Sequence, residues 1–373
     1  MPGSSTKTRW GKPPWTIDFH PARRPLPEEV DFAVIGGGFS GLAAAAWLRR
    51  LAPLQSVALF EAASIGAGSS GHTGGVPLAE TAAGDLPGLG DVLAGFSGVL
   101  CELGVDCDLA LPGAWELSRD GGLPNLPVAW ADSGMLRVAR EVPGGTLDPG
   151  KLVSGLARAA QDSGALLFEN ARVEEIVFEE PLRVRVSGGQ LRAQHVLIAT
   201  NAESLELSGL AGRAQPTFTL AVATEPLTAA QLEALGLLAR KPFYTIDLPY
   251  LWGRLLATNG VVFGSGLVHL EDWRELAALD IAAGEAAELI ARLEQRVRGM
   301  HPMLQSVQFT HRWGGPILIA EDRRPVFTRH ARSSRVFVLG AYSGHGVALS
   351  VHLGRWAAEA MLGRKKLPEW YAA

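Results

Sequence analysis

The stretch VDFAVIGGGFSGLAAAAWLRRLAPLQSVALFE, residues 30–61, decides the fold. It begins with a short apolar run, passes through a glycine turn into a segment rich in alanine and leucine, and returns to a second apolar run, SVALFE. Two apolar runs joined by a helix form a βαβ unit, because parallel strands need a crossover connection of a dozen or more residues. The sequence therefore predicts a parallel sheet near the N-terminus.

The glycine turn in this unit has the spacing of a dinucleotide-binding motif. Residues 36–41, GGGFSG, fit the pattern G-x-G-x-x-G, and an acidic residue ends the second apolar run. In such a motif the glycines permit a tight turn and a close approach of the pyrophosphate, and the acid accepts a hydrogen bond from a ribose hydroxyl. The alternative is a glycine-rich turn that binds nothing. The predicted contacts are Gly36, Gly38, Phe39, Ser40, Gly41 and Glu61.

A second glycine-rich stretch, GAGSSGHTGG at residues 66–75, indicates which dinucleotide is bound. It contains five glycines and three hydroxyl side chains, so it has little to bury and takes its shape from what it contacts. An NAD-binding unit needs no such loop after its second strand, whereas the longer second half of FAD can be covered by backbone amides. The predicted FAD contacts here are Ala62, Ala67, Gly68, Ser69, Ser70, Gly71, His72, Thr73, Gly74 and Gly75.

The rest of the chain predicts two kinds of sheet. A helical pattern after Asp148-Pro149 is followed by alternating strands that end in the apolar run VLIAT. Residues 217–319 contain several separate strand-like runs and a hairpin signal at Asn259-Gly260, which favours an antiparallel sheet. One helix is expected within that region, residues 284–299, with its apolar residues on one face.

Composition limits the partners. The 373 residues are 47% hydrophobic and carry a formal net charge of -4, which indicates a globular protein without the basic surface that nucleic acid requires. Residues 1–27 are rich in proline and lack the apolar run of a secretory signal, and no apolar window is long enough to span a membrane. We therefore expect an extended N-terminal arm, a cytoplasmic location and no membrane partner.

The two cysteines, Cys101 and Cys107, have neither the spacing of zinc ligands nor the number for a disulfide framework. No metal is predicted. Both lie in residues 78–145, where periodicity is weak and where we expect short helices and loops with one strand near AWELS.

Five segments, in this order and spacing, resemble the FAD-dependent D-amino-acid oxidase superfamily: VDFAVIGGGFSGLAAAAWL, FEAASIGAGSSGHTGG, LDPGKLVSGLARAA, HVLIATNAES and VFVLGAYSGHGVALS. The closest resemblance is to its glycine/sarcosine oxidase-like and gamma-glutamylputrescine oxidase-like members, over residues 30 to 365. It implies an α/β fold with two lobes, a Rossmann-type FAD-binding lobe with a parallel sheet and an inserted substrate lobe with an antiparallel sheet. The expected division is 1–27 for the arm, 28–80, 146–212 and 320–373 for the FAD-binding lobe, and 81–145 and 213–319 for the substrate lobe.

The resemblance also implies further contacts with FAD. The turn SGHGV leads into a C-terminal helix whose N-terminus would point at the flavin N1 and C2 carbonyl, where reduction adds negative charge. One valine would hold the adenine side through its backbone. The contacts implied are Val173, Thr200, Gly340, Gly344, His345, Gly346, Val347 and Ala348. We expect non-covalent FAD, since both cysteines lie outside the segments that line the cofactor.

The reaction implied by the resemblance is oxidation of an amine. Hydride leaves the carbon beside nitrogen for flavin N5, the imine hydrolyses, and O2 or another acceptor reoxidises the flavin, with hydrogen peroxide as the product if O2 is used. Relatives that oxidise amino acids place an arginine in a G-L-R-P turn to bind the carboxylate. The matching turn here is RWGGPI, residues 312–317, which lacks that arginine and favours an amine as substrate.

Three other hypotheses stay open. One is an amino-acid oxidase in which Arg254 or Arg312 replaces the missing arginine; another is a flavoprotein subunit that binds or transfers electrons for a partner; the weakest is an NAD-linked dehydrogenase. Each candidate catalytic side chain also has a structural explanation. Aromatic and basic residues of strands commonly pack or pair, and the two histidines can be loop residues that face water. The candidates are His72, His345, Tyr250, Trp313 and Arg254, with Trp252 beside them.

Overall fold

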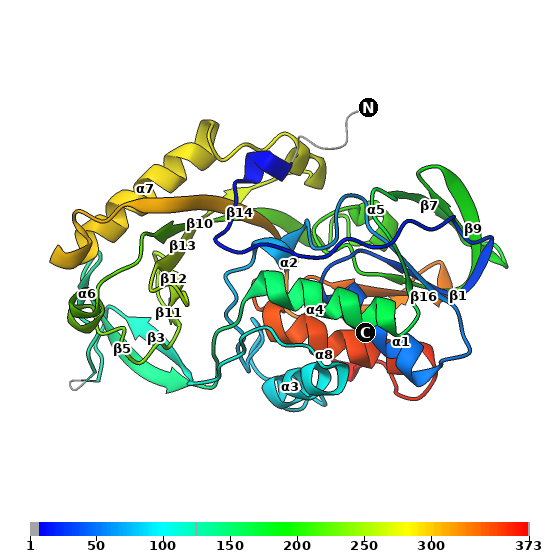
Figure 1. Cartoon of the computed structure of the whole chain (residues 1–373), viewed down its shortest axis with the longest axis horizontal. Coiled ribbons are helices and arrows are strands. Elements are labelled where there is room, and N and C mark those ends of the chain that lie inside the picture. The colour runs from blue at the N-terminus through cyan, green and yellow to red at the C-terminus, as the bar shows by residue number, and fades with distance from the viewer. Residues whose placement is uncertain (1–6, 124–125, 372–373) are drawn as a thin grey trace.

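The computed structural model describes residues 7–123 and 126–371 and has two lobes, each built on an eight-stranded sheet (Figure 1). The first sheet has the order β15-β16-β9-β1-β2-β6, in which β1, β2, β6, β9 and β16 run parallel. A hairpin of β7 and β8 extends it antiparallel to β9. The strand bounds are β1 Glu29–Ile35, β2 Val57–Phe60, β6 Leu166–Phe168, β7 Val173–Val177, β8 Leu182–Val186, β9 Gly189–Ile198, β15 Val326–His330 and β16 Ser333–Gly340. The predicted βαβ unit is confirmed.

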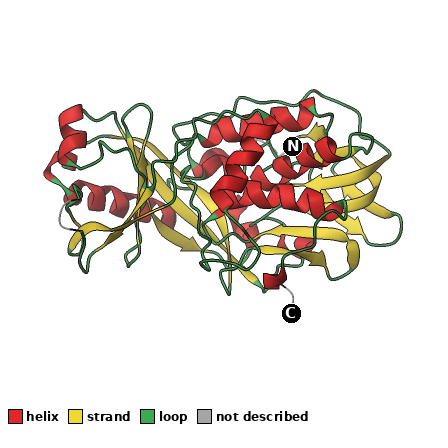
Figure 2. Cartoon of the chain, turned by 90° about the horizontal axis from the view of Figure 1, so that it is seen from below, coloured by secondary structure: helices red, strands yellow, loops and turns green. Residues whose placement is uncertain are grey.

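Helices cover this sheet on the side that Figure 1 shows below it. They are α1 Phe39–Leu51, α3 Val92–Leu103, α4 Pro149–Asp162 and α8 Gly346–Met361. Asp148 caps α4, as predicted, by accepting from the Lys151 amide. Helices α1 and α8 approach closely at Gly354, where a Cβ would lie only 2.7 Å from the Ser40 carbonyl oxygen. Figure 2 shows the same concentration of helices in one lobe.

The helix α3 lies in a different lobe from the one that the sequence predicts for it. Its apolar residues share one buried cluster with α1, α4 and α8, so it belongs to the helical layer of the first lobe, although residues 81–145 were assigned to the substrate lobe. The reason is that its apolar side chains are buried against α8 rather than against the second sheet. The other lobe boundaries stay a prediction.

The second sheet has the order β14-β10-β13-β12-β11-β3-β5-β4 and is antiparallel except between β11 and β3. The bounds are β3 Ala114–Ser118, β4 Trp130–Ala131, β5 Met135–Val142, β10 Ala214–Thr224, β11 Phe243–Thr245, β12 Trp252–Leu255, β13 Val261–His269 and β14 Phe309–Ala320. The hairpin at Asn259-Gly260 joins β12 to β13, with Asn259 at φ +67°. The expectation of loops before residue 145 missed β5, whose side chains alternate between buried and exposed over MLRV.

A long helix, α7 Gly284–Met300, packs on this sheet. The apolar face predicted for it is buried: Ala286, Ile290, Leu293 and Val297. The remaining helices are short: α2 Ser69–His72, α5 Leu205–Ser208, α6 Ala229–Ala234, η1 Lys7–Trp10, η2 Trp273–Ala277, η3 Pro302–Leu304 and η4 Glu369–Tyr371. Within the described ranges, no helix has the length and apolar character needed to cross a membrane.

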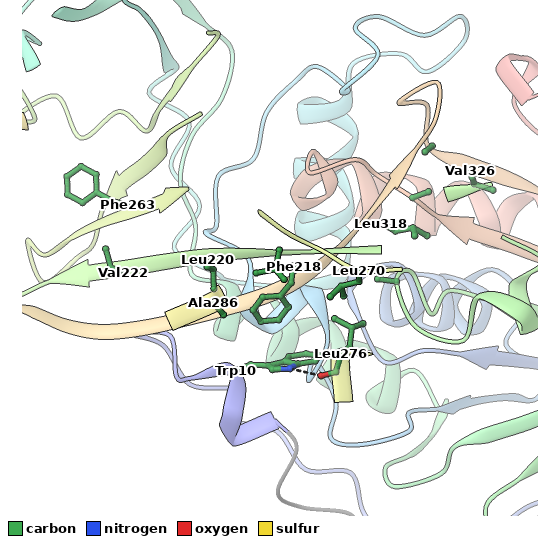
Figure 3. Close-up of a cluster of buried hydrophobic side chains, with 14 of the residues drawn as sticks. Trp10, Phe218, Leu220, Val222, Phe263, Leu270, Leu276, Ala286, Leu318 and Val326 are labelled. Carbon is green, nitrogen blue, oxygen red and sulfur yellow. Dashed lines mark hydrogen bonds between the residues drawn. The ribbon is translucent and has the colours of Figure 1, made fainter. Parts of the chain in front are cut away.

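The N-terminal arm is anchored to the protein between Trp10 and Phe19, although its composition suggested only an extended segment. Trp10 is 3% exposed, packs edge-on against Phe218 with ring centroids 5.5 Å apart, and donates its indole N–H to the Leu276 carbonyl (Figure 3). Trp15 and Phe19 are also buried. The arm thus contributes three aromatic side chains to the core.

Replacing Trp10 with alanine should lower the free energy of unfolding by about 3 kcal/mol, because a buried aromatic ring and its hydrogen bond are both lost. Leu54→Ala is the matched control, since Leu54 is 99% exposed, and it should change stability by less than about 0.5 kcal/mol. Urea titration followed by tryptophan fluorescence and circular dichroism measures both. Equal stabilities of the two variants would show that the arm does not contribute to the fold.

Candidate active site

The glycine turn lies at the carboxyl end of β1, where ligands of open α/β sheets bind. Gly36 has φ +110° and donates its amide to the Phe60 carbonyl, a conformation that disfavours side chains. A Cβ on Gly41 would lie 2.0 Å from the Gly36 carbonyl oxygen. A Cβ on Gly38 would meet Ser70 Oγ at 2.8 Å. All three motif glycines are therefore required by close contacts.

Glu61 directly follows β2, beside this turn. One carboxylate oxygen accepts from the Gly37 amide and the other from the Ala63 amide, both at 2.9 Å. A carboxylate at this position can also accept from a ribose hydroxyl. Glu61 thus holds the glycine turn in place. Its contact with the ribose of the cofactor stays a prediction.

Three further segments meet the glycine turn at this edge of the sheet. Ser70 Oγ, from the loop of residues 66–75, accepts from the Phe39 amide at 2.9 Å. Asn201, after β9, donates to Ser69 Oγ at 3.1 Å and accepts from the Ala341 amide at 3.0 Å. The structure therefore brings together the loop, the end of β9 and the turn before α8, as the sequence predicted.

The last of these segments also touches α1. Tyr342 forms a 2.6 Å hydrogen bond with Ser40 Oγ, and the turn places Ala341, Ser343 and Gly344 at positive φ before α8 begins at Gly346. His345 precedes the helix, and Val347 and Ala348 are buried in its first turn. The N-terminus of α8 is consequently fixed against that of α1.

Several features at this junction fit FAD. Thr200 Oγ1 is buried and has no hydrogen-bond partner among the described residues. A Cβ on Gly344 would meet no atom within 4 Å, and one on Gly68 would meet only Glu203 Oε1, at 4.0 Å, so both glycines border open space. The first-turn amides of α1 and α8 lack intrahelical acceptors and favour negative charge. A pyrophosphate at α1 and a flavin ring near α8 suit these donors.

The loop is held from its other side by the arm and the second sheet. Trp15 donates its indole N–H to the Gly71 carbonyl at 2.8 Å, and Trp313 donates to the His72 carbonyl at 3.0 Å. The His72 ring packs edge-on against Trp10, 5.5 Å between centroids, and its Nδ1 lies 3.0 Å from the Gly68 carbonyl. These contacts give His72 a structural place, and its contact with FAD stays a prediction.

One face of the second sheet is turned toward the loop, and we call it the site face. Residues paired across neighbouring strands project to the same face. Trp252 lies against Gly74, where a Cβ would come within 2.0 Å of the indole, and Trp313 bonds the loop as described. The row of paired residues on the site face is Arg140, Glu116, Tyr244, Trp252, Gly264, Ala221 and Trp313.

Arg254 projects to the site face two residues after Trp252. It is 5% exposed, donates its Nε hydrogen to the Gly74 carbonyl and lies over the Trp15 ring, 5.5 Å from the centroid. Burial lowers the pKa of Arg254 to about 10, and the charge of Asp148 opposes this shift. Arg254 is therefore a buried cation behind the loop.

Arg312 is not placed to bind a substrate carboxylate. Its segment RWGGPI is the middle of strand β14 and not a turn, because these residues pair continuously with β10. As the neighbour of Trp313, Arg312 projects to the opposite face, where it forms an ion pair with Glu294 of α7.

The charge of an acidic side chain that the sequence did not single out, Glu80, acts on Tyr250 and on His345. Burial raises the pKa of Tyr250 to about 12 and the charge of Glu80 adds to this rise, yet 44% of the residue is exposed. Burial lowers the pKa of His345, which the Ser343 carbonyl and the charge of Glu80 oppose.

The remaining predicted contacts are distributed along the same edge. Gly340 is the last residue of β16, and a Cβ there would lie 3.4 Å from Asn201. Val173 is buried at the start of β7 and pairs with Val186. Three residues that hold the loop or the turn before α8 were not singled out from the sequence: Trp15, Asn201 and Tyr342. For Trp15 alone a signal was present, in the aromatic content of the arm.

Comparison with known proteins identifies the family. Residues 31–360 match the family model described as FAD dependent oxidoreductase. The chain belongs to this family. FAD is therefore its cofactor, in a family where non-covalent binding is typical, and the resemblance found in the sequence is confirmed.

Individual relatives agree with this assignment. Gamma-glutamylputrescine oxidoreductase of Escherichia coli K12 is 27% identical over 377 residues, covering 89% of this chain and 84% of that protein. The crystal structure of glycine oxidase from Geobacillus kaustophilus has a TM-score of 0.71 at 20% identity, covering 91% of this chain and 96% of that one. That of L-proline dehydrogenase from P. horikoshii has a TM-score of 0.72 at 19% identity, covering 93% and 97%. These structures confirm the fold of the oxidoreductase.

Gly38→Val should abolish FAD retention, because the new side chain would enter the space of Ser70 Oγ and of the phosphate. Gly98→Val is the control, since a Cβ at Gly98, in α3, meets no atom within 4 Å. The ratio of visible flavin absorbance to protein absorbance measures retention in each purified variant. A fully flavinylated Gly38→Val protein would contradict the assignment of this turn.

Acid precipitation should release the flavin into a yellow supernatant. Cys101 is exposed on α3, and burial raises the pKa of Cys107 to about 12 with help from neighbouring aspartates, which leaves that thiol unreactive. A coloured protein pellet would instead show covalent attachment.

Proposed function

We propose that this chain oxidises the C–N bond of an amine to an imine, which water converts to an aldehyde or ketone. FAD, when bound, accepts the hydride that leaves the carbon beside nitrogen. O2 or another acceptor then takes the electrons, with hydrogen peroxide as product in the case of O2. The relative from Escherichia coli, whose name records an amine substrate, supports this class of donor.

The observation that carries the choice of an amine is the composition of the site face. Beside the loop it presents aromatic rings and a carboxylate, and the β14 segment that would carry an arginine presents Trp313 and glycines. Aromatic walls suit a cationic or apolar amine. Arg312 faces α7 and is paired there.

We further propose that the chain's own residues prepare the site in two ways. The N-terminus of α8 stabilises the negative charge that two-electron reduction adds to the cofactor. The loop, the arm and the site face exclude water from one side and orient the donor. The predicted cofactor contacts at residues 36, 38–41, 61, 62, 67–75, 173, 200, 340 and 344–348 belong to this proposal. The two-lobe division and a cytoplasmic location belong to it as well.

One observation favours a second function. Arg254 is buried on the site face and has no carboxylate within ion-pairing distance among residues 7–123 and 126–371. A substrate carboxylate would form an ion pair with Arg254, as in an amino-acid oxidase. Its hydrogen bond to Gly74 and its contact with Trp15 place it behind the loop, which is why the amine is preferred.

Anaerobic titration of the holoenzyme separates these functions. Primary alkylamines and diamines should bleach the oxidised flavin spectrum, whereas glycine, sarcosine and L-proline should leave it unchanged. Bleaching by the amino acids alone, lost in Arg254→Met, would establish the second function. A flavin that stays oxidised with every donor would instead favour a subunit that binds or transfers electrons for a partner.

A further inference from the structure

Glu80 lies five residues after the glycine-rich loop and is held toward the site face. Its neighbours are fixed to the segment after β5, because the Ala79 amide donates to the Pro143 carbonyl at 3.3 Å and Leu78 forms a β-bridge with Gly144. The carboxylate reaches Tyr244, whose hydroxyl lies 2.6 Å from Glu80 Oε1. Glu80 is half-buried and Tyr244 is buried.

The same tyrosine touches a second carboxylate. Tyr244 Oη lies 2.8 Å from Glu116 Oε1, and Glu116 is bound by two nitrogens of Arg140, its partner across the strands. Burial would raise the pKa of Glu116, but the hydrogen bonds from Arg140 and Tyr244 outweigh it and lower the pKa. Glu116 is therefore an ionised and neutralised carboxylate.

Among the described residues, Glu80 has no ion-pair partner of this kind. A phenol carries one proton, so Tyr244 can donate to only one of the two carboxylates. Arg140 forms an ion pair with Glu116 and is influenced only at longer range by the charge of Glu80, which also raises the pKa of Arg140. No lysine, arginine or histidine in the described part of the chain forms an ion pair with Glu80. Glu80, Glu116 and Arg140 together carry one net negative charge, and a cation beside Glu80 would balance it.

The cluster adjoins the predicted reaction site, because Trp252, the strand partner of Tyr244, packs against Gly74 of the loop. The charge of Glu80 acts on Tyr250, a residue that is accessible to solvent, and on His345, which precedes α8. Trp252, the strand partner of Tyr244, supplies an aromatic face next to it. Arg254 is turned toward Gly74 and Trp15 instead. The surroundings of Glu80 thus suit an organic cation.

We propose that Glu80 is the specificity-determining residue that binds the ammonium group of the substrate, with Tyr244 and Glu116 positioning its carboxylate. This inference rests on the proposed function and narrows it: the substrate binds as an alkylammonium ion and carries no carboxylate beside the reacting carbon. A substrate carboxylate at that place would lie next to an unneutralised anion and be repelled.

Two compounds that share a tert-butyl group and carry opposite charges test this inference on the FAD-loaded protein. tert-Butylammonium has no hydrogen on the carbon beside nitrogen and is not oxidised, and pivalate is its anionic counterpart. Binding is measured by calorimetry and by perturbation of the flavin spectrum. Wild type should bind tert-butylammonium in preference to pivalate, and Glu80→Gln should bind the cation about tenfold more weakly, because a charge-assisted hydrogen bond is replaced by a neutral one.

Two further variants control for fold and for overall charge. Glu80→Asp keeps the charge and should still prefer the cation. Glu141→Gln makes the same substitution at the neighbour of Arg140, a residue that pairs with Lys241, and should bind the cation like wild type. Melting temperature and flavin content show whether each variant is folded.

Unchanged cation binding in Glu80→Gln, a preference of wild type for pivalate, or no binding of tert-butylammonium by wild type would each overturn the inference. Its failure is distinguishable from failure of the proposed function. If amines bleach the flavin and Glu80→Gln shows the same KM as wild type, only the role of Glu80 is wrong. If tert-butylammonium binding depends on Glu80 but no amine is oxidised, only the proposed reaction is wrong.

Discussion

The glycine-rich loop of residues 66–75 is the constraint on which both lobes depend. It cannot form a core of its own, and its path is set by hydrogen bonds from segments far apart in the chain. Phe39 and Asn201 bond its serines, while Trp15 and Trp313 bond its carbonyls. Each such bond contributes about 1 kcal/mol, and together they select one backbone path between the α1 N-terminus and the second sheet.

This arrangement explains why the two lobes form one site. The first sheet brings α1, β9 and the turn before α8 to one edge, and the second sheet lays its site face against the opposite side of the loop. A donor on the site face therefore lies next to the cofactor without a large rearrangement, which is the main advantage a protein gives to a reaction whose chemistry resides in the cofactor. The arm closes the remaining side of the loop.

The sequence predicted the parts of the fold that local patterns specify. The βαβ unit, the Asp148 cap, the hairpin at Asn259-Gly260 and the apolar face of α7 each depend on residues within a few turns of one another. The site was predicted where it is backbone, at the glycine turn and the loop. The parts of the site that are assembled from side chains were missed. Tyr244 bonds Glu80, which is 164 residues away in the sequence, and Glu116, which is 128 residues away. Periodicity in one sequence carries no signal for such pairs, and it could not show that Arg312 faces away while Arg254 is buried.

The most direct test of this account is a crystal structure of the protein purified with its own cofactor. We predict FAD with its pyrophosphate at the first turn of α1 and its flavin ring between the loop of residues 66–75 and the N-terminus of α8, with the site face across from the ring. A different nucleotide at this edge, or a flavin bound elsewhere in the molecule, would contradict the account.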